Sequence, residues 1–250
     1  MSNIKTELGD KTVWYKHLPG AALLETELVN LNKVLPKMCG YYAVQIGGQT
    51  DNTDILSQSP IHNHIIVNPD ISLKHNNRSL AVKCELEELP FLEESIDLFA
   101  LIHALEFAKK PELVLKEIYR SLLPGGYLTI LGFNPYSLWG IVKFWKNSRK
   151  NIWGKNWIRL KLLRNWLIEI GFKIDSCETF YFRPPCANAN TKKMTFLETL
   201  GKFFWPHCGA SYMVVAQKAS LLLTPINHPN YFIKRVEPIK GLPKPTSRVT

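Results

Sequence analysis

The hydrophobic residues of this chain form short apolar runs that alternate with segments in which apolar residues recur every three or four positions. Each apolar run ends where polar residues take over, a pattern typical of β-strands. The run at residues 96–105 is apolar at almost every position, which predicts a central strand covered on both faces. The predicted strands comprise residues 42–47, 64–68, 79–85, 96–105, 127–133, 172–182 and 211–218.

Helices are predicted between these strands. Residues 111–123 begin with Pro111 and place apolar side chains on one stripe, and the PGG sequence at 124–126 stops this helix. Residues 159–171 form a second amphipathic stretch that ends at Gly171. Strands that alternate with helices predict an α/β fold with a doubly wound, mostly parallel, seven-stranded sheet. The last two strands are expected to pair as an antiparallel edge.

Three further segments lie outside this alternation. Residues 1–40 contain a helix candidate and are predicted to form a helical N-terminal addition to a domain that spans residues 41–218. Residues 134–158 form a basic, aromatic insertion in that domain. Residues 219–250 contain five prolines and mostly basic charges, so we expect an extended, partly ordered tail.

Composition limits the class of protein. A chain of 250 residues with 46% apolar content can bury the core of one ordinary domain. It has no uncharged apolar run of about 18 residues, and its first residues lack the apolar core of a signal peptide, so a cytoplasmic protein without a spanning helix is expected. The five cysteines are widely spaced and form no CxxC pair, which indicates reduced thiols and predicts no metal site.

The net charge of +10 is unevenly distributed along the chain. Residues 136–167 hold eight Lys or Arg, no Asp or Glu, and five tryptophans. Basic residues interleaved with tryptophan suit an anionic membrane surface, where indoles lie at headgroup level. They also suit RNA, whose bases stack on aromatic rings. A third interpretation is that the tryptophans cover a pocket and the lysines are solvated surface. The sequence leaves all three open.

Candidate ligand-binding residues follow the first four predicted strands at their carboxyl ends, where open parallel sheets bind ligands. They are Gly47, Gly48 and Gln49 after the first strand, Asn68 at the second, Glu85 at the third and His103 at the fourth. Glycines at such a position allow backbone to approach a ligand and supply amide donors.

Each candidate also has a purely structural explanation. Gly47 and Gly48 can form a tight turn with no ligand. Asn68 precedes a proline in a common turn pair, and His103 can be a hydrogen-bonded histidine at a strand end. The functional interpretation rests on their order at four successive strand ends.

A longer pattern resembles a known family. The segment ELEELPFLEESIDLFALIHALEF at 85–107, with LLPGGYLTILGF at 122–133, is similar to class I S-adenosylmethionine-dependent methyltransferases of the type 11 group. The shared features are LPF, an acid four positions before it, SxD before the fourth strand and LxPGG before the fifth. GFNPYSLWG at 132–140 is more narrowly similar to a poorly characterised bacterial set. The resemblance implies a Rossmann-like class I methyltransferase fold with S-adenosylmethionine as cofactor.

The resemblance also implies roles for individual residues. Glu85 stands where the family has its adenine-binding acid, and Leu86 stands where a neighbouring residue covers the adenine ring. His103 and Ala104 belong to the loop that approaches the methionine part of the cofactor. Residues 47–51 correspond to the glycine loop.

The glycine loop is where the sequence departs from the family pattern. The family has an acid two positions before the first glycine and glycines at alternate positions, whereas this chain has Gln45, Gly47, Gln49 and Asp51 there. Asn68 likewise stands where the family has a ribose-binding acid. An amide can bind hydroxyl groups but lacks the charge that strengthens such bonds.

The sequence therefore predicts a methyltransferase that acts on a small or lipid-like acceptor. Methyl transfer needs mainly positioning and exclusion of water. Where an acceptor needs a base, His103, Asn134 and Tyr136 are candidates near the pocket mouth, and no catalytic residue is assigned. The altered loop motivates one alternative, a catalytically inactive methyltransferase-like binding or scaffold protein. A nicotinamide dehydrogenase is a weaker alternative, because GGQTDN lacks the GxGxxG pattern.

Overall fold

The computed structural model describes residues 20–48, 55–67, 79–146, 156–184 and 208–219, together with 201, 203 and 205. At its centre is one seven-stranded sheet in the order β3-β2-β1-β4-β5-β7-β6. The strands are β1 (Tyr42–Gly47), β2 (Asn63–Val67), β3 (Ser79–Val82), β4 (Ile96–Ile102), β5 (Leu122–Phe133), β6 (Phe172–Phe180) and β7 (Ser211–Lys218). The helices are α2 (Gly20–Val34), α3 (Pro111–Ser121), α4 (Leu138–Lys146) and α5 (Leu160–Ile170), with short 3-10 turns η1 (Leu35–Lys37) and η2 (Ile55–Gln58).

The pairing of the strands confirms the predicted doubly wound fold. Strands β3, β2, β1, β4 and β5 pair in parallel, so the chain crosses over between each consecutive pair of them. Strand β7 lies between β5 and β6 and is antiparallel to both. The predicted antiparallel pairing of the last two strands is therefore confirmed, with β6 at the edge of the sheet.

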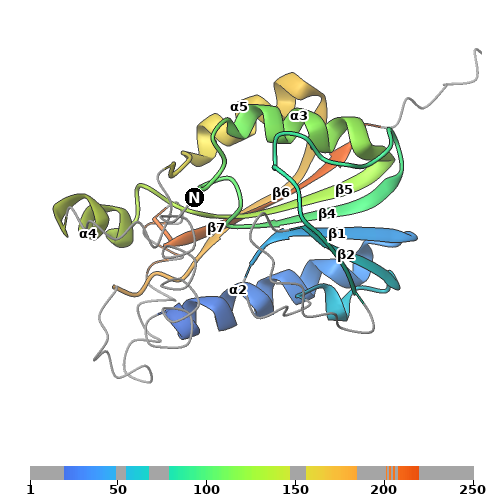
Figure 1. Ribbon diagram of the computed structural model, residues 1–250. Coiled ribbons are helices and arrows are strands. Elements are labelled where there is room, and N and C mark those ends of the chain that lie inside the picture. The colour runs from blue at the N-terminus through green and yellow to red at the C-terminus, as the bar shows by residue number, and fades with distance from the viewer. Residues whose placement is uncertain are drawn as a thin grey trace, which may run out of the picture. The chain divides into compact units, whose positions relative to one another are not determined.

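Side chains of the central strands alternate between the two faces of the sheet and so contribute to two cores. Val44 and Ile46 of β1 pack in the core beneath α3 and α5, whereas Ala43 packs in the core on the α2 side. Figure 1 shows α3 and α5 on one side of the sheet and α2 on the other. Almost every residue of β4 is buried, as predicted for a strand covered on both faces.

Helix α2 packs against one face of the sheet and contributes to the core there. Leu23 and Leu31 are completely buried, one turn before and one turn after Glu27, which is also buried. These positions recur every four residues, so they share one face of the helix. A carboxylate therefore lies in the middle of the apolar face that α2 turns towards the sheet.

Strand β5 begins earlier than the sequence predicts. Ile96 of β4 pairs with Leu122, but Leu98 pairs with Tyr127, so residues 123–126 form a bulge within the strand. The PGG sequence lies in this bulge, and Gly125 has a φ of +81° that a residue with a Cβ rarely adopts. The helix before it ends at Ser121, as the break predicts to within two residues.

The topology identifies the end of the sheet at which a ligand is expected to bind. Strand order reverses between β1 and β4, and in open α/β sheets ligands bind beyond the carboxyl ends of the strands at such a point. Strand β1 ends there at Gly47 and β4 at Ile102, which pair with each other. We call this side the carboxyl edge of the sheet.

Candidate functional site

The turn after β1 requires both of its glycines. Gly47 and Gly48 have φ angles of +78° and +93°, and a Cβ on Gly47 would lie 2.5 Å from the carbonyl oxygen of Ile102. The backbone N–H of Gly48 donates to that same oxygen at 3.0 Å. The chain thus turns against the end of β4 at a distance that only glycine permits.

Gln45 holds this turn from within the sheet. Its side chain is buried, its Oε1 accepts the N–H of Ile55 at 3.0 Å, and its Nε2 donates to the carbonyl of Gly47 at 3.3 Å. A carboxylate at this position could accept from Ile55 but could not donate to Gly47. The amide therefore has a structural function that the family's acid lacks.

His103 lies at the tip of β4 between two carboxylates. Its Nε2 is 2.9 Å from Glu27 Oε1, and its Nδ1 is 3.3 Å from Glu106 Oε1. The exposed fractions of the three side chains are 5% for His103, 1% for Glu27 and 2% for Glu106. His103 has a φ of +49°, which is uncommon for a residue other than glycine. We call these three residues the Glu27–His103–Glu106 cluster.

The cluster connects three elements at the carboxyl edge. Glu106 Oε1 also accepts the N–H of Phe133 at the end of β5, at 2.8 Å. The ring of His103 stacks on Phe133 with 4.0 Å between centroids, and Phe133 stacks on Trp157 at 5.1 Å. Helix α2, the tip of β4 and the end of β5 therefore meet around one imidazole ring.

His103 is protonated at neutral pH in this setting. Burial by itself lowers the pKa of His103, but the negative charges of Glu27 and Glu106 and the hydrogen bonds to both more than offset burial and raise the pKa to about 10. A ring that already holds both protons cannot accept another. The geometry thus argues against His103 as the base that the sequence suggested.

Glu85 and Leu86, the predicted adenine contacts, lie beyond β3. Glu85 is exposed, and its Oε2 accepts from Lys109 Nζ at 3.0 Å. The pKa of Lys109 is raised because it hydrogen-bonds to Glu85 and is attracted by its charge. Leu86 is buried in the core under α3 and α5. Both residues follow the carboxyl end of β3, and their roles in cofactor binding stay predictions.

The two other candidate bases differ in their surroundings. Asn134 is buried, and its Nδ2 donates to the carbonyl of Gly209 at 2.9 Å while its Oδ1 accepts the N–H of Tyr136 at 3.1 Å. Asn134 thus holds the turn after β5 against the segment before β7. Tyr136 is exposed, and the guanidinium of Arg159 lies 5.6 Å from its ring centroid. Gln49, Asp51 and Asn68 lie outside the described residues.

The tryptophans of the basic segment at 136–167 have different surroundings. Trp139 of α4 is fully buried, and its Nε1 donates to the carbonyl of Arg183 at 2.8 Å. Trp157 belongs to the aromatic stack, and Trp166 lines a hollow between helices. Leu138 and Ile141 of α4 are exposed instead. Trp139 and Trp157 thus anchor the segment to the body of the protein.

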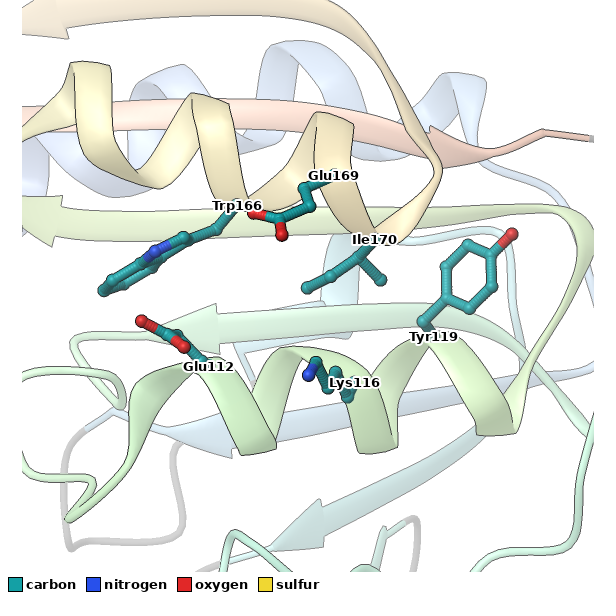
Figure 2. Close-up of a pocket in the computed structure, with 6 residues that line it drawn as sticks. All are labelled: Glu112, Lys116, Tyr119, Trp166, Glu169 and Ile170. Atoms are coloured by element: carbon teal, nitrogen blue, oxygen red, sulfur yellow. The ribbon is translucent and has the colours of Figure 1, made fainter.

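A hollow of about 330 Å³ lies between α3 and α5. Figure 2 shows its six lining residues, which α3 and α5 contribute equally: Glu112, Lys116, Tyr119, Trp166, Glu169 and Ile170. It lies on the outer helical layer, and none of the predicted site residues lines it. We therefore place the candidate site at the carboxyl edge.

Sequence reasoning missed Glu27 and Glu106. Glu27 was detectable as an isolated acid on the apolar stripe of a predicted helix, and Glu106 as an acid three residues after His103. Neither signal indicates that the two carboxylates meet, since Glu27 is 76 positions from His103. Within the described residues, no group of three His, Cys, Asp or Glu side chains has the arrangement of a metal site. None of the helices described there is long and apolar enough to cross a membrane.

The fold and the position of this site define a class I methyltransferase fold, as the sequence predicts. The comparison with protein families agrees: residues 62–130 match the model of the family described as Methyltransferase domain. The chain therefore has the fold of class I S-adenosylmethionine-dependent methyltransferases, and the family match covers its residues 62–130.

Three comparisons illustrate the relationship. The chain is 26% identical over 195 residues to the uncharacterized protein YafS of Escherichia coli K12, covering 78% of this chain and 75% of that protein. A SAM-dependent methyltransferase from Archaeoglobus fulgidus matches with a TM-score of 0.58 and 19% identity, covering 78% of this chain and 94% of that one. A possible histamine N-methyltransferase from Thermotoga maritima matches with a TM-score of 0.56 and 19% identity, covering 77% and 89%. These structural matches show a shared fold.

Proposed function

We propose that the protein binds S-adenosylmethionine at the carboxyl edge and transfers its methyl group to a small or lipid-like acceptor. The observation that carries this proposal is the contact between the two central strand ends, where Gly48 donates to Ile102 beside a position that excludes any Cβ. In open α/β sheets, ligands bind beyond the carboxyl ends of the strands at such a switch point. In this proposal Glu85, which is exposed after the third strand, contacts the adenosine part, and Gln49 and Asn68 complete the set.

The cofactor supplies a methyl group on a positively charged sulfur. Transfer breaks the bond between carbon and sulfur, leaves the electron pair on sulfur, and forms a bond from the acceptor to carbon. The protein has to hold the acceptor in line and exclude water. The buried, aromatic surroundings of the carboxyl edge, with Phe133 and Trp157 stacked beside His103, suit such a dry site.

Calorimetric titration with S-adenosylmethionine and its demethylated product tests the proposal. We expect micromolar binding by the wild type and a loss of about tenfold or more in Glu85→Ala, because a charged hydrogen bond typically contributes about 1.5–3 kcal/mol. Glu88→Ala is the matched control, since Glu88 is an exposed acid on the same segment. If no heat of binding were detected up to millimolar ligand, the alternative of an inactive scaffold would be favoured.

We further propose that the protein is cytoplasmic and that residues 136–167 meet an anionic membrane surface at its periphery. The observation in favour is that α4 exposes Leu138 and Ile141 beside exposed Tyr136, within a segment of eight basic residues and no acid. Apolar side chains next to basic ones suit the boundary between headgroups and acyl chains. This arrangement favours a membrane over RNA, because Trp139 is fully buried and cannot stack on bases, whereas Leu138 and Ile141 are exposed.

Sedimentation with phosphatidylglycerol-containing vesicles at low and high salt tests this surface. We expect retention at low salt and a loss of about a hundredfold or more in the double variant Leu138→Ser and Ile141→Ser, since burying each side chain contributes about 1.5–3 kcal/mol. Leu92→Ser is the control, because Leu92 is 80% exposed on another part of the protein. Retention of single-stranded RNA but not of vesicles would overturn the membrane proposal in favour of RNA.

A further inference from the structure

The Glu27–His103–Glu106 cluster has hydrogen-bonding capacity that the described residues do not use. Glu27 Oε2 and Glu106 Oε2 are both buried and have no hydrogen-bond partner among the described residues. A buried carboxylate oxygen without a donor costs free energy, so such atoms are rare in native structures. Each of these two oxygens can therefore accept a hydrogen bond from a ligand.

The cluster also carries an unbalanced charge. One imidazolium faces two carboxylates, so with both carboxylates ionised the net charge is −1. Phe133 stacks on the imidazole, and the phenol of Tyr212 lies close enough for the charge of Glu106 to contribute to its raised pKa. In such surroundings a negative charge strongly favours a cation or a hydrogen-bond donor and repels an anion.

The position of the cluster is next to the proposed cofactor turn. His103 directly follows Ile102, whose carbonyl binds the N–H of Gly48. A Cβ on Gly47 would also lie 3.3 Å from the Cβ of Ala104, so the turn and the β4 tip are in contact. A ligand group at the cluster therefore lies within reach of a cofactor held at the turn.

We propose that the Glu27–His103–Glu106 cluster is the subsite for the methyl acceptor, and that the acceptor is an amine whose N–H groups donate to the two unpartnered carboxylate oxygens. This inference rests on the proposed function and specifies its substrate class. A carboxylate or phosphate acceptor would be repelled there. Glu27 lies on α2 and Glu106 follows β4, so the amine would enter between α2 and the tip of β4. In this proposal α2 moves slightly away from the sheet when the amine binds.

The three residues have distinct functions in this subsite. An amine nitrogen that gains a methyl group also gains a positive charge, and it must release one proton to become neutral again. A carboxylate oxygen of Glu27 or Glu106 accepts that proton, while His103, which hydrogen-bonds to both, is a positioning residue that fixes their orientation.

Two cofactor analogues test the subsite by binding alone. Sinefungin carries a primary amine where the cofactor carries its methyl group, whereas S-adenosylhomocysteine carries no group there. We expect the wild type to bind sinefungin about tenfold or more tightly than S-adenosylhomocysteine, because the amine can donate hydrogen bonds to carboxylate oxygens and such charge-assisted bonds are strong. Glu27→Gln and Glu106→Gln should each reduce this preference to about threefold or less, because each removes one of the two carboxylates.

The control is Glu25→Gln, because Glu25 is an exposed acid on the same helix as Glu27. It should keep the wild-type preference. Retained binding of S-adenosylhomocysteine shows that each variant is folded, so a merely structural cluster would lower the melting temperature and leave the preference unchanged. That outcome overturns the subsite and leaves the proposed function intact. Failure of the wild type to bind either analogue contradicts the proposed function itself.

Discussion

At the scale of single residues, the site depends on backbone geometry as much as on side chains. This chain keeps the family's glycine at position 47 but has Gln49 where the family has another glycine. The structure gives the reason why Gly47 is kept. Its φ is positive and the carbonyl of Ile102 fills the space that a Cβ would need. Both the conformational requirement and the steric one therefore act at this position.

Gly47→Ala and Gly125→Ala separate these two requirements. Both glycines have φ near +80°, but the nearest atom to a Cβ on Gly125 is 4.0 Å away, against 2.5 Å for Gly47. We expect Gly125→Ala to lower the free energy of unfolding by about 1–2 kcal/mol and Gly47→Ala to lower it by more, because only Gly47 adds a clash. Equilibrium denaturation with urea measures both. Equal losses would contradict the close contact between β1 and β4.

The charge of His103 predicts how stability depends on pH. The pKa of His103 is raised from 6.5 to about 10 in the folded protein, so the folded state holds a proton that the unfolded state releases between these values. Its contribution to stability is therefore fully present below pH 6.5 and is lost as pH rises towards 10. His103→Gln has no such proton, so its free energy of unfolding should fall less over this window. If urea denaturation showed that the free energy of unfolding changes with pH by the same amount in both proteins, the imidazole would not be protonated.

The roles of these residues differ in how far the sequence can predict them. The position of His103 at a strand end follows from local pattern and from the family resemblance. Its partners do not, because Glu27 comes from a helix 76 positions earlier and local pattern carries no information on that pairing. Gln45 appears in the sequence only as a missing acid, whereas its two hydrogen bonds to the turn emerge only from the fold.

At the scale of elements, apolar periodicity predicts the strands well and their junctions less well. Strands β1 and β7 have the predicted bounds, because each ends at a clear change from apolar to polar residues. Strand β5 was predicted to start at 127, yet it starts at Leu122, since a bulge allows the PGG sequence to stay within the strand. Helix α2 was predicted from its spacing, but not the buried acid on its apolar face.

Helix α2 is expected to contribute to stability as a core element. Leu31→Ala should lower the free energy of unfolding by about 2–5 kcal/mol, because Leu31 is completely buried and its truncation leaves a cavity. Val29→Ala on the same helix is the control and should cost about 0.5 kcal/mol or less, because Val29 is 52% exposed. Urea denaturation again provides the measurement. Similar small losses in both variants would mean that α2 detaches easily from the sheet.

At the scale of the molecule, sheet order and binding position follow from the alternation of strands and helices. The reversal of strand order between β1 and β4 brings the Gly47 turn and the Glu27–His103–Glu106 cluster to one edge. The hollow between α3 and α5 lies on another part of the molecule and has no such convergence of strand ends. A bound cofactor should therefore protect the carboxyl edge and leave that hollow unaffected.

Hydrogen–deuterium exchange with and without saturating S-adenosylmethionine tests this localisation directly. We predict slower exchange of backbone amides in peptides that cover residues 42–48 and 102–108, because these segments form the turn after β1 and the tip of β4. Peptides from α3 and α5 that line the hollow should exchange at unchanged rates. Protection confined to α3 and α5, or no protection at any ligand concentration, would contradict a cofactor site at the carboxyl edge.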